Sequence, residues 1–207
     1  MVEEDVVFLV QAPAARAGPV RRVARMANVM PPLGLLSIAA YLEESGYHTR
    51  VFDLNADPGS RDDLLEGLRG GRPVFLGISA VTASFNGGVE IARLARSVLP
   101  EVKIIFGGPH VSALREKILQ DYPVIDAVVV GEGEKTFGEL LDAGMESAER
   151  VKGLVYRDDT GEVRFSGERQ ERLEVDSLPY PAYHRLHSFP DGYRPPLFTF
   201  PRLRSLR

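Results

Sequence analysis

Five short runs along this chain are almost continuously apolar and rich in Val, Ile and Phe. Strands covered on both faces show such runs, whereas strands with one wet face alternate apolar and polar residues. The runs are Val6–Val10, Thr49–Leu54, Val74–Ser79, Val102–Phe106 and Ile125–Val130. We therefore expect five strands of a parallel sheet that carries helices on both of its faces.

Stretches of helical periodicity separate these runs. Pro31 and Pro32 precede the first stretch and Gly46 follows it, which is typical of the start and the end of a helix. The predicted helices are Leu33–Ser45, Asp62–Arg69, Ser84–Leu99, Ser112–Gln120 and Thr136 to about Met145. Right-handed crossovers leave few topologies for such β–α units. The prediction is an α/β fold: a flavodoxin-like (Rossmann-like), doubly wound five-stranded parallel sheet of order 2-1-3-4-5.

The pattern changes after residue 150. Two strand-like runs, 153–157 and 162–165, flank Asp158-Asp159-Thr160-Gly161, and this arrangement predicts a β-hairpin. From Leu178 onward, repeated prolines exclude a long helix and predict an extended connector that is apolar enough to lie against another surface. We expect a Rossmann-like domain at 1–150, a hairpin extension at 151–177, and a connector at 178–207 that is cut within a linker.

Composition narrows the functional classes. The 207 residues carry a formal net charge of −4, so the chain lacks the basic field of a nucleic-acid-binding protein and the polybasic anchor of a membrane-surface protein. It has no run of about 18 apolar residues, and its acidic start, 1–5, predicts a cytoplasmic location. The absence of cysteine excludes disulfides, thiolate zinc sites, cysteine nucleophiles and cysteine-ligated iron–sulfur clusters on this chain.

The loops at the carboxyl ends of the strands are the expected ligand-binding loops of such a sheet. The first loop has no G-x-G-x-x-G, and no G-x-x-x-x-G-K-[ST] occurs anywhere, which excludes the common dinucleotide and triphosphate sites. Its four arginines fit either a solvated basic loop or a flap over a flat ligand. Asp53, near the end of the second run, could hold a ribose, although the missing glycine fingerprint does not support that role. The arginines are Arg16, Arg21, Arg22 and Arg25.

Hydroxyl groups follow the third predicted strand. Ser79 ends that run, and Thr82 and Ser84 come shortly after it. Ser84 is suited to be the N-cap of the next helix. Ser79 lies within the mouth of the sheet, where a cap does not explain it.

Glycines follow the fourth and fifth predicted strands. In Gly107-Gly108-Pro109-His110 the glycines let a bulky group approach the backbone, although a plain turn has the same signature. His110 fits a helix residue, a ligand or a hydrogen-bond donor. In Gly131-Glu132-Gly133-Glu134 the carboxylates fit the helix dipole or, less commonly, acid–base catalysis. The loops predict a wide mouth without a nucleophile or a metal site, typical of a protein that binds a large group bringing its own chemistry.

Five motifs carry a resemblance to a known family. They are Pro31-Pro32-Leu33-Gly34-Leu35, Gly77-Ile78-Ser79, Gly107-Gly108-Pro109-His110, Gly131-Glu132-Gly133-Glu134 with Phe137, and Leu178-Pro179-Tyr180-Pro181-Ala182-Tyr183. In this order and spacing, residues 5 to about 187 resemble the cobalamin-binding domain that precedes the radical S-adenosylmethionine domain of cobalamin-dependent radical enzymes.

The resemblance implies a cobalamin site. Ser79-Ala80-Val81 stands at the family's S-x-L signature and Gly107-Gly108 at its G-G signature. Ser79 would hold the dimethylbenzimidazole end of the cofactor, and the two glycines would give its tail passage, so Gly108→Val is expected to block binding. Thr82 is a helper in this scheme. The remaining implied cofactor contacts are Pro109, His110, Gly131, Glu132 and Gly133, with no catalytic residue and no metal ligand.

Two departures from the family pattern qualify this resemblance. The D-x-H-x-x-G signature after strand one is missing, as in the radical branch of the family, so no histidine of that loop would ligate cobalt from below. The C-x-x-x-C-x-x-C motif is also missing, so S-adenosylmethionine and a four-iron, four-sulfur cluster would belong to a missing domain, joined in cis or in trans. The chain would be a cobalamin-binding fragment of a methyltransferase that uses methylcobalamin, or a stand-alone cobalamin carrier.

Two other classes of function stay open at this point. A non-catalytic flavodoxin-like regulatory or interaction module would have its mouth filled by its own side chains. An enzyme acting on a nucleotide-linked small molecule would use Glu132 and Glu134 in its site.

Overall fold

The computed structural model describes residues 6–14, 30–57, 59–71, 73–171 and 173–193. The four arginines of the first loop, the acidic start and residues 194–207 lie outside these ranges. The predictions that concern them therefore fall outside the described residues.

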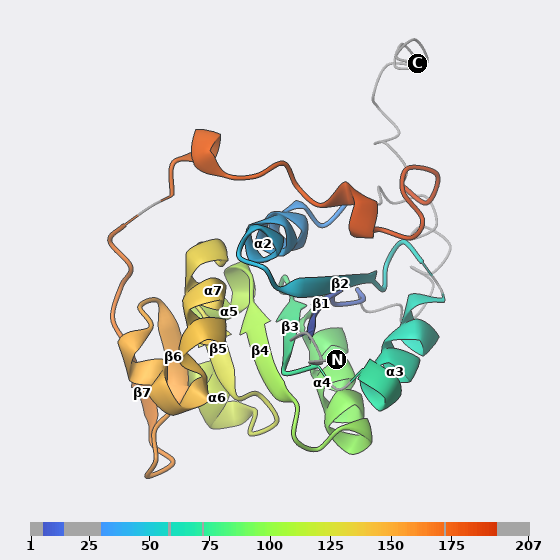
Figure 1. Ribbon diagram of the computed structural model, residues 1–207. Helices are drawn as coiled ribbons and strands as arrows, with labels where there is room; N and C mark the ends of the chain where they lie inside the picture. The colour runs from blue at the N-terminus through green and yellow to red at the C-terminus, as the bar shows by residue number, and fades with distance from the viewer. Residues whose placement is uncertain (1–5, 15–29, 58, 72, 172, 194–207) are drawn as a thin grey trace.

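The centre of the fold is a sheet in the order β2-β1-β3-β4-β5-β6-β7 (Figure 1). Its first five strands are parallel, so the predicted order 2-1-3-4-5 is confirmed. β1 lies between β2 and β3, which places the reversal of strand order beside β1 and β3. The strands are β1 (Val6–Gln11), β2 (His48–Asp53), β3 (Phe75–Ser79), β4 (Lys103–Gly107) and β5 (Ala127–Val129).

The predicted hairpin is present and continues the sheet. It consists of β6 (Leu154–Arg157) and β7 (Val163–Phe165), and β6 pairs with β5 in the antiparallel direction. Asp158 shapes the turn, because its carboxylate accepts hydrogen bonds from the backbone N–H groups of Thr160 and Glu162. The sheet therefore has seven strands, of which the last two are antiparallel.

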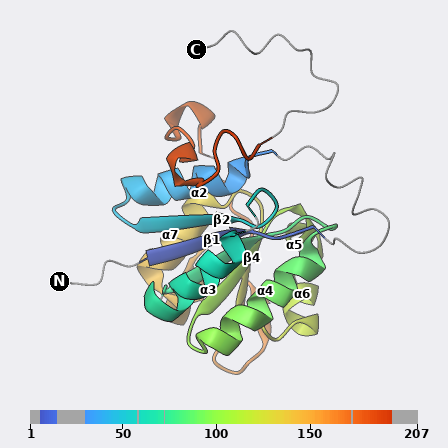
Figure 2. The ribbon, with the colours of Figure 1, turned by 90° about the vertical axis from the view of Figure 1, so that its right-hand side faces the viewer.

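Helices cover both faces of the sheet, as Figure 2 shows for α2 on one side and α3 and α4 on the other. On one face, α2 (Leu33–Glu44) and α7 (Glu134–Ala143) pack against side chains such as Val7 and Leu9. The other face is covered by α3 (Ser60–Gly71), α4 (Phe85–Val98), α5 (Pro109–Leu114) and α6 (Glu116–Asp121). The described residues include no helix that is both long and apolar enough to cross a membrane.

The predicted helix at 112–120 is wrong in one respect, because it is broken at Arg115. This residue has φ 48° and ψ −118°, which ends α5 and lets α6 begin in a new direction. The break lets both short helices bury an apolar side chain, Val111 from α5 and Leu119 from α6. The Arg115 guanidinium then lies over the ring of Phe165 on the hairpin, at 5.1 Å.

The described part of the chain after the hairpin lies against the domain. It contains two single turns, η2 (Val175–Ser177) and η3 (Tyr183–Arg185). Figure 1 shows it leaving β7 in orange and crossing α2 in red. The backbone N–H of Ala182 donates a hydrogen bond to the carbonyl of Leu36 in α2, at 3.1 Å.

Candidate functional site

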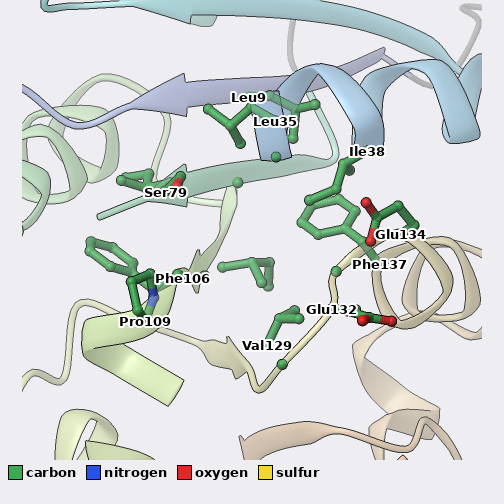
Figure 3. A pocket seen from close by; sticks show the side chains of 18 residues that line it. Leu9, Leu35, Ile38, Ser79, Phe106, Pro109, Val129, Glu132, Glu134 and Phe137 are labelled. Carbon is green, nitrogen blue, oxygen red and sulfur yellow. The ribbon is translucent and has the colours of Figure 1, made fainter. Parts of the chain in front are cut away.

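A cavity of about 340 Å³ lies at the carboxyl ends of β3, β4 and β5, between the sheet and the first turns of α2 and α7. Figure 3 shows the side chains arranged around its centre. The walls are mainly apolar and include Leu9, Leu35, Ile38 and Phe137. The cavity lies beside the reversal of strand order, where doubly wound sheets bind their ligands.

Glycines shape the cavity in two different ways. At Gly107 and Gly131 a Cβ atom would meet nothing within 4 Å, so the missing side chain leaves open space. At Gly133 a Cβ atom would come within 2.7 Å of Cδ1 of Ile38, and at Gly77 within 2.9 Å of Cδ2 of Leu9. These two glycines let the apolar wall approach the backbone, whereas Gly107 and Gly131 keep the edge of the cavity open.

Gly108 was expected to leave room for the cofactor tail, but the structure shows that the backbone conformation requires a glycine there. Its φ is +107°, and a Cβ atom there would lie 2.6 Å from the carbonyl oxygen of Ala80. A valine at 108 would therefore strain the β4–α5 turn itself. At Gly107, by contrast, the Cβ position is open, so a side chain there would enter the cavity without meeting protein atoms.

Ser79 lies at the end of β3 and lines the cavity, as predicted (Figure 3). It is fixed by the sheet, because it pairs with Gln11 of β1 and with Gly107 of β4, and its carbonyl accepts a hydrogen bond from Ala12 N–H at 3.0 Å. Among the described residues, none forms a hydrogen bond with the Ser79 hydroxyl. This hydroxyl is available to a ligand.

The two glutamates stand at the mouth of the cavity, at the start of α7. The hydroxyl of Ser37 in α2 donates a hydrogen bond to Oε1 of Glu134, at 2.7 Å. Glu132 is exposed. Glu134 thus ties the two helices together, and the pair does not form an enclosed acid–base site.

Thr82 and His110 do not line this cavity. Nδ1 of His110 lies 3.2 Å from Oγ1 of Thr82, and the imidazole packs against Phe85 with ring centroids 4.5 Å apart. Both residues border a separate hollow between α4, α5 and α6. Of the nine predicted contacts, the cavity brings together the other seven: Ser79, Gly107, Gly108, Pro109, Gly131, Glu132 and Gly133.

Ser84 was expected to cap the first turn of α4, but its hydroxyl bonds within the preceding loop instead. Ser84 precedes α4, but its side chain makes no hydrogen bond to the first turn of that helix. Its hydroxyl oxygen instead accepts the N–H of Val81 at 3.1 Å, within the β3–α4 loop. The residue therefore shapes the loop next to Ser79 and Ala80.

Asp53 is engaged by the protein. Its Oδ1 accepts the N–H of Asn55 at 2.9 Å and its Oδ2 accepts the hydroxyl of Tyr193 at 3.1 Å. Burial raises the pKa of Asp53, although these hydrogen bonds oppose the rise. A ribose hydroxyl would have to displace Tyr193, so the interpretation of Asp53 as a ribose ligand is not supported. Within the described ranges, no three His, Asp or Glu side chains gather as metal ligands.

The apolar wall is the part of the site that sequence reasoning missed. Leu9, Leu35, Ile38 and Phe137 have the sequence signature of ordinary core residues. Only Gly77 gives a usable signal, because a glycine inside an apolar strand indicates close approach of another group. Here that group is the side chain of Leu9.

Comparison with known proteins adds an independent line of evidence. A family model described as "B12 binding domain" matches residues 21–141. An uncharacterized methyltransferase of Pyrococcus horikoshii is 34% identical over 158 residues, which cover 75% of this chain and 34% of the relative. The cobalamin-dependent radical SAM methyltransferase TokK of Streptomyces tokunonensis is 33% identical over 69 residues, which cover 33% of this chain and 10% of the relative.

A solved structure shares the fold. It is the radical S-adenosylmethionine methyltransferase TsrM from Kitasatospora setae, with a TM-score of 0.61 at 20% identity. The match covers 79% of this chain and 30% of that chain. The chain thus spans about a third of the length of the Pyrococcus relative and of TsrM.

Proposed function

The chain belongs to the B12-binding domain family, and from this membership we propose that it binds the tail of cobalamin in the cavity beyond β3, β4 and β5. The observation that carries this assignment is the open edge at Gly107 beside the Ser79 hydroxyl. An apolar hollow with one available hydroxyl suits a flat aromatic base with few polar atoms.

The dimensions of the cavity agree with part of a corrinoid. Small-molecule sites range from about 300 to 1,000 Å³, and this cavity is at the lower end with about 340 Å³. A cavity of this size would hold only part of the cofactor, so the nucleotide end would lie in it and the corrin ring would lie outside it, over the carboxyl ends of the strands. Ser79 would bond the base, and the backbone at Gly107 and Gly131 would border the tail.

The other predicted cofactor contacts lie at the mouth of the cavity or outside it. Pro109, Glu132 and Gly133 border the mouth, where they would meet the part of the cofactor that emerges. Thr82 and His110 would contact cofactor only beyond the cavity, if the corrin extends over the β3–α4 and β4–α5 loops.

The parent activity is part of the same proposal. We infer that residues 1–150 form the cofactor domain, 151–177 its hairpin extension and 178–207 a connector toward a radical S-adenosylmethionine domain. That domain, in cis or in trans, would hold S-adenosylmethionine and the four-iron, four-sulfur cluster, for which this chain has no cysteine. The methyltransferases among the similar proteins favour methyl transfer as the reaction. Bound methylcobalamin would supply the methyl group, and this chain would hold and orient it.

The open cavity disfavours the two other classes. A regulatory module would be expected to fill its own mouth, whereas this one is bordered by glycines with free space beyond them. An acid–base enzyme would need an enclosed pair of carboxylates, whereas Glu132 is exposed and Glu134 is held by Ser37.

A binding experiment tests the proposal. The full chain is mixed with hydroxocobalamin, free ligand is removed by gel filtration, and the retained visible absorbance is measured. Wild type should retain cobalamin, and Gly107→Val should weaken binding by about 10- to 100-fold, because the new side chain enters the cavity. A strand position accepts valine well, so the variant should fold.

Gly70→Val is the matched control. Gly70 also has open space around its Cβ position, but it lies in α3, on the packed face of the sheet. The Gly70→Val variant should bind cobalamin as tightly as wild type does. Loss of absorbance in wild type would overturn cobalamin binding, and wild-type affinity in Gly107→Val would exclude this cavity as the site.

A further inference from the structure

The segment that follows the hairpin crosses both helices that wall the cavity. We call residues 166–171 and 173–193 the strap. In Figure 1 the strap leaves β7 in orange and crosses α2 in red, and its contacts show that it also touches α7. The strap therefore contacts both helices that wall the cavity, while the sheet forms the third wall.

Arg169 is the main anchor of the strap on α7. Its Nη1 donates a hydrogen bond to Oε1 of Glu139 at 3.1 Å, and its Nη2 pairs with Oε2 of the same carboxylate. Its Nε donates to the hydroxyl of Thr136 at 3.0 Å. The side chain is only 13% exposed, which is low for an arginine ion pair. A second ion pair, between Lys135 and Glu171, lies beside it.

Arg185 is the corresponding anchor on α2. Its Nε donates a hydrogen bond to Oε1 of Glu43 at 2.6 Å, and the hydroxyl of Thr49 donates to the same oxygen at 2.5 Å. Close by, Ala182 is fully buried and its N–H bonds the Leu36 carbonyl. The strap is thus fixed to α2 by a backbone bond and by an ion pair.

These anchors lie on the sides of the helices that face away from the cavity. Successive helical residues are about 100° apart, so Glu139 points away from Phe137 of the cavity wall and Thr136 lies to one side of it. In α2, Leu36 and Glu43 likewise lie opposite Ile38 and Gly34. The strap holds each helix from behind.

The far end of the strap is fixed at the carboxyl edge of the sheet. The hydroxyl of Tyr193 donates a hydrogen bond to the buried carboxylate of Asp53 at the end of β2. Phe189 packs between Tyr183 and Tyr193, with centroid distances of 4.9 and 5.9 Å. The strap is therefore attached to α7, to α2 and to the end of β2, in addition to the bonds of Ser166 to β6 and of Glu168 to Arg115 near its start.

We propose that the strap positions α2 and α7 for cofactor binding, with Arg169 and Arg185 as positioning residues that never touch the ligand. The inference rests on the proposed function, because it concerns the affinity of the same cavity. The two helices also contact each other directly, through the Ser37–Glu134 hydrogen bond and through the close approach of Gly138 in α7 to Tyr41 in α2, so the strap adds to these contacts. Without the strap, the helices should separate more often, and cofactor would have to reorder them on binding.

The test uses three single substitutions in the full chain: Arg169→Met, Arg185→Met and Arg164→Met. Arg164 is the matched control, because it also pairs with carboxylates, Asp158 and Glu162, but on the hairpin tip away from the cavity. Hydroxocobalamin affinity and amide hydrogen exchange of α2 and α7 are measured at a temperature where all the variants are folded. Arg169→Met and Arg185→Met should each weaken binding about three- to tenfold and speed exchange in α7 or α2 respectively.

The lysine substitutions Arg169→Lys and Arg185→Lys separate positioning from folding. Lysine keeps the positive charge but not the forked geometry of arginine. Arg185→Lys should therefore restore most of the cobalamin affinity, because Arg185 bonds only one oxygen of Glu43. Arg169→Lys should restore less, because Arg169 bonds both oxygens of Glu139. Wild-type affinity in both methionine variants, or an equal loss in Arg164→Met, would overturn the role of the strap alone. Failure of wild type to retain cobalamin would overturn the proposed function itself.

Discussion

Alternate residues of each strand point to opposite faces of the central sheet. At the carboxyl ends of the strands, one face is closely packed and the other contains the cavity. In β1 and β3, Phe8 and Leu76 face α3 and α4, where both are fully buried in the larger apolar cluster. Their neighbours Leu9 and Gly77 face α2 and α7 and border the cavity. One set of strands thus builds a closed face and an open face at once.

Glycine contributes to both faces with opposite results. At Gly88 of α4, a Cβ atom would come within 3.1 Å of the Phe106 ring and 3.3 Å of Ile78, so the missing side chain lets the helix pack closely on the sheet. At Gly107 a Cβ atom would meet nothing within 4 Å. A glycine under a helix, such as Gly88, therefore allows close packing on one face of the sheet. A glycine at a strand end that no helix covers, such as Gly107, leaves empty space on the other face.

The largest expected effect is on stability, in a matched pair of leucines. Leu76 and Leu9 are both fully buried, on the closed and the open face respectively. Leu76→Ala should cost about 4–5 kcal/mol, because it leaves a void within close packing, and Leu9→Ala about 2–3 kcal/mol, because it enlarges a cavity that already exists. Urea unfolding of the two variants measures the difference, and equal costs would show that the two faces are equally closed.

A smaller effect is expected at the Ser79 hydroxyl. Ser79→Ala removes the available hydrogen-bonding group from the open face, so cobalamin should bind about two- to tenfold more weakly while the unfolding free energy stays close to wild type. Ser97→Ala on α4 is the control, since this exposed hydroxyl bonds the Leu94 carbonyl of its own helix, on the side of the sheet away from the cavity. Unchanged titrations of the visible spectrum in Ser79→Ala would remove this hydroxyl from the site.

The parallel part of the fold was predictable because its signals are local. Continuous apolar runs indicate strands buried on both faces, and the helical stretches between them leave only crossover connections. The structure confirms the five strands and their order. Two features depend on contacts distant in sequence: the pairing of β6 with β5 and the helix break at Arg115, whose guanidinium packs on Phe165 of the hairpin.

The site was predictable where it consists of strand ends. Ser79, Gly107 and Gly131 end or follow strands, and the sheet brings such positions together. Thr82 and His110 also follow strands, but they lie toward the other face of the sheet, where His110 packs on Phe85 of α4. That direction depends on the packing of two helices, for which neither loop carries a signal.

The smallest expected effect concerns acid, which should loosen the open face before the closed one. Burial of Glu43 would raise its pKa, but the hydrogen bonds from Thr49 and Arg185 and the charges of Arg185 and His184 outweigh this, so the pKa lies below its ordinary value. The ionised form therefore stabilises the folded state. This contribution is complete above the unfolded carboxyl pKa of about 4.3 and is lost as the pH falls through the lower folded value.

Asp53, where the strap is attached to β2, contributes to stability with the opposite pH dependence. Burial raises its pKa, so the folded state binds this proton more tightly than the unfolded state does, and acid does not weaken that attachment. Because the contribution of Glu43 is lost, the hydrogen-exchange protection of α2 should fall about two- to fivefold relative to that of α4 between about pH 6 and pH 3, and it should fall near Glu43 first. Glu43→Gln should give a protection ratio that is lower at neutral pH and nearly independent of pH. If that variant keeps the wild-type pH dependence, or if α4 loses protection before α2, Glu43 is not what makes the open face sensitive to acid.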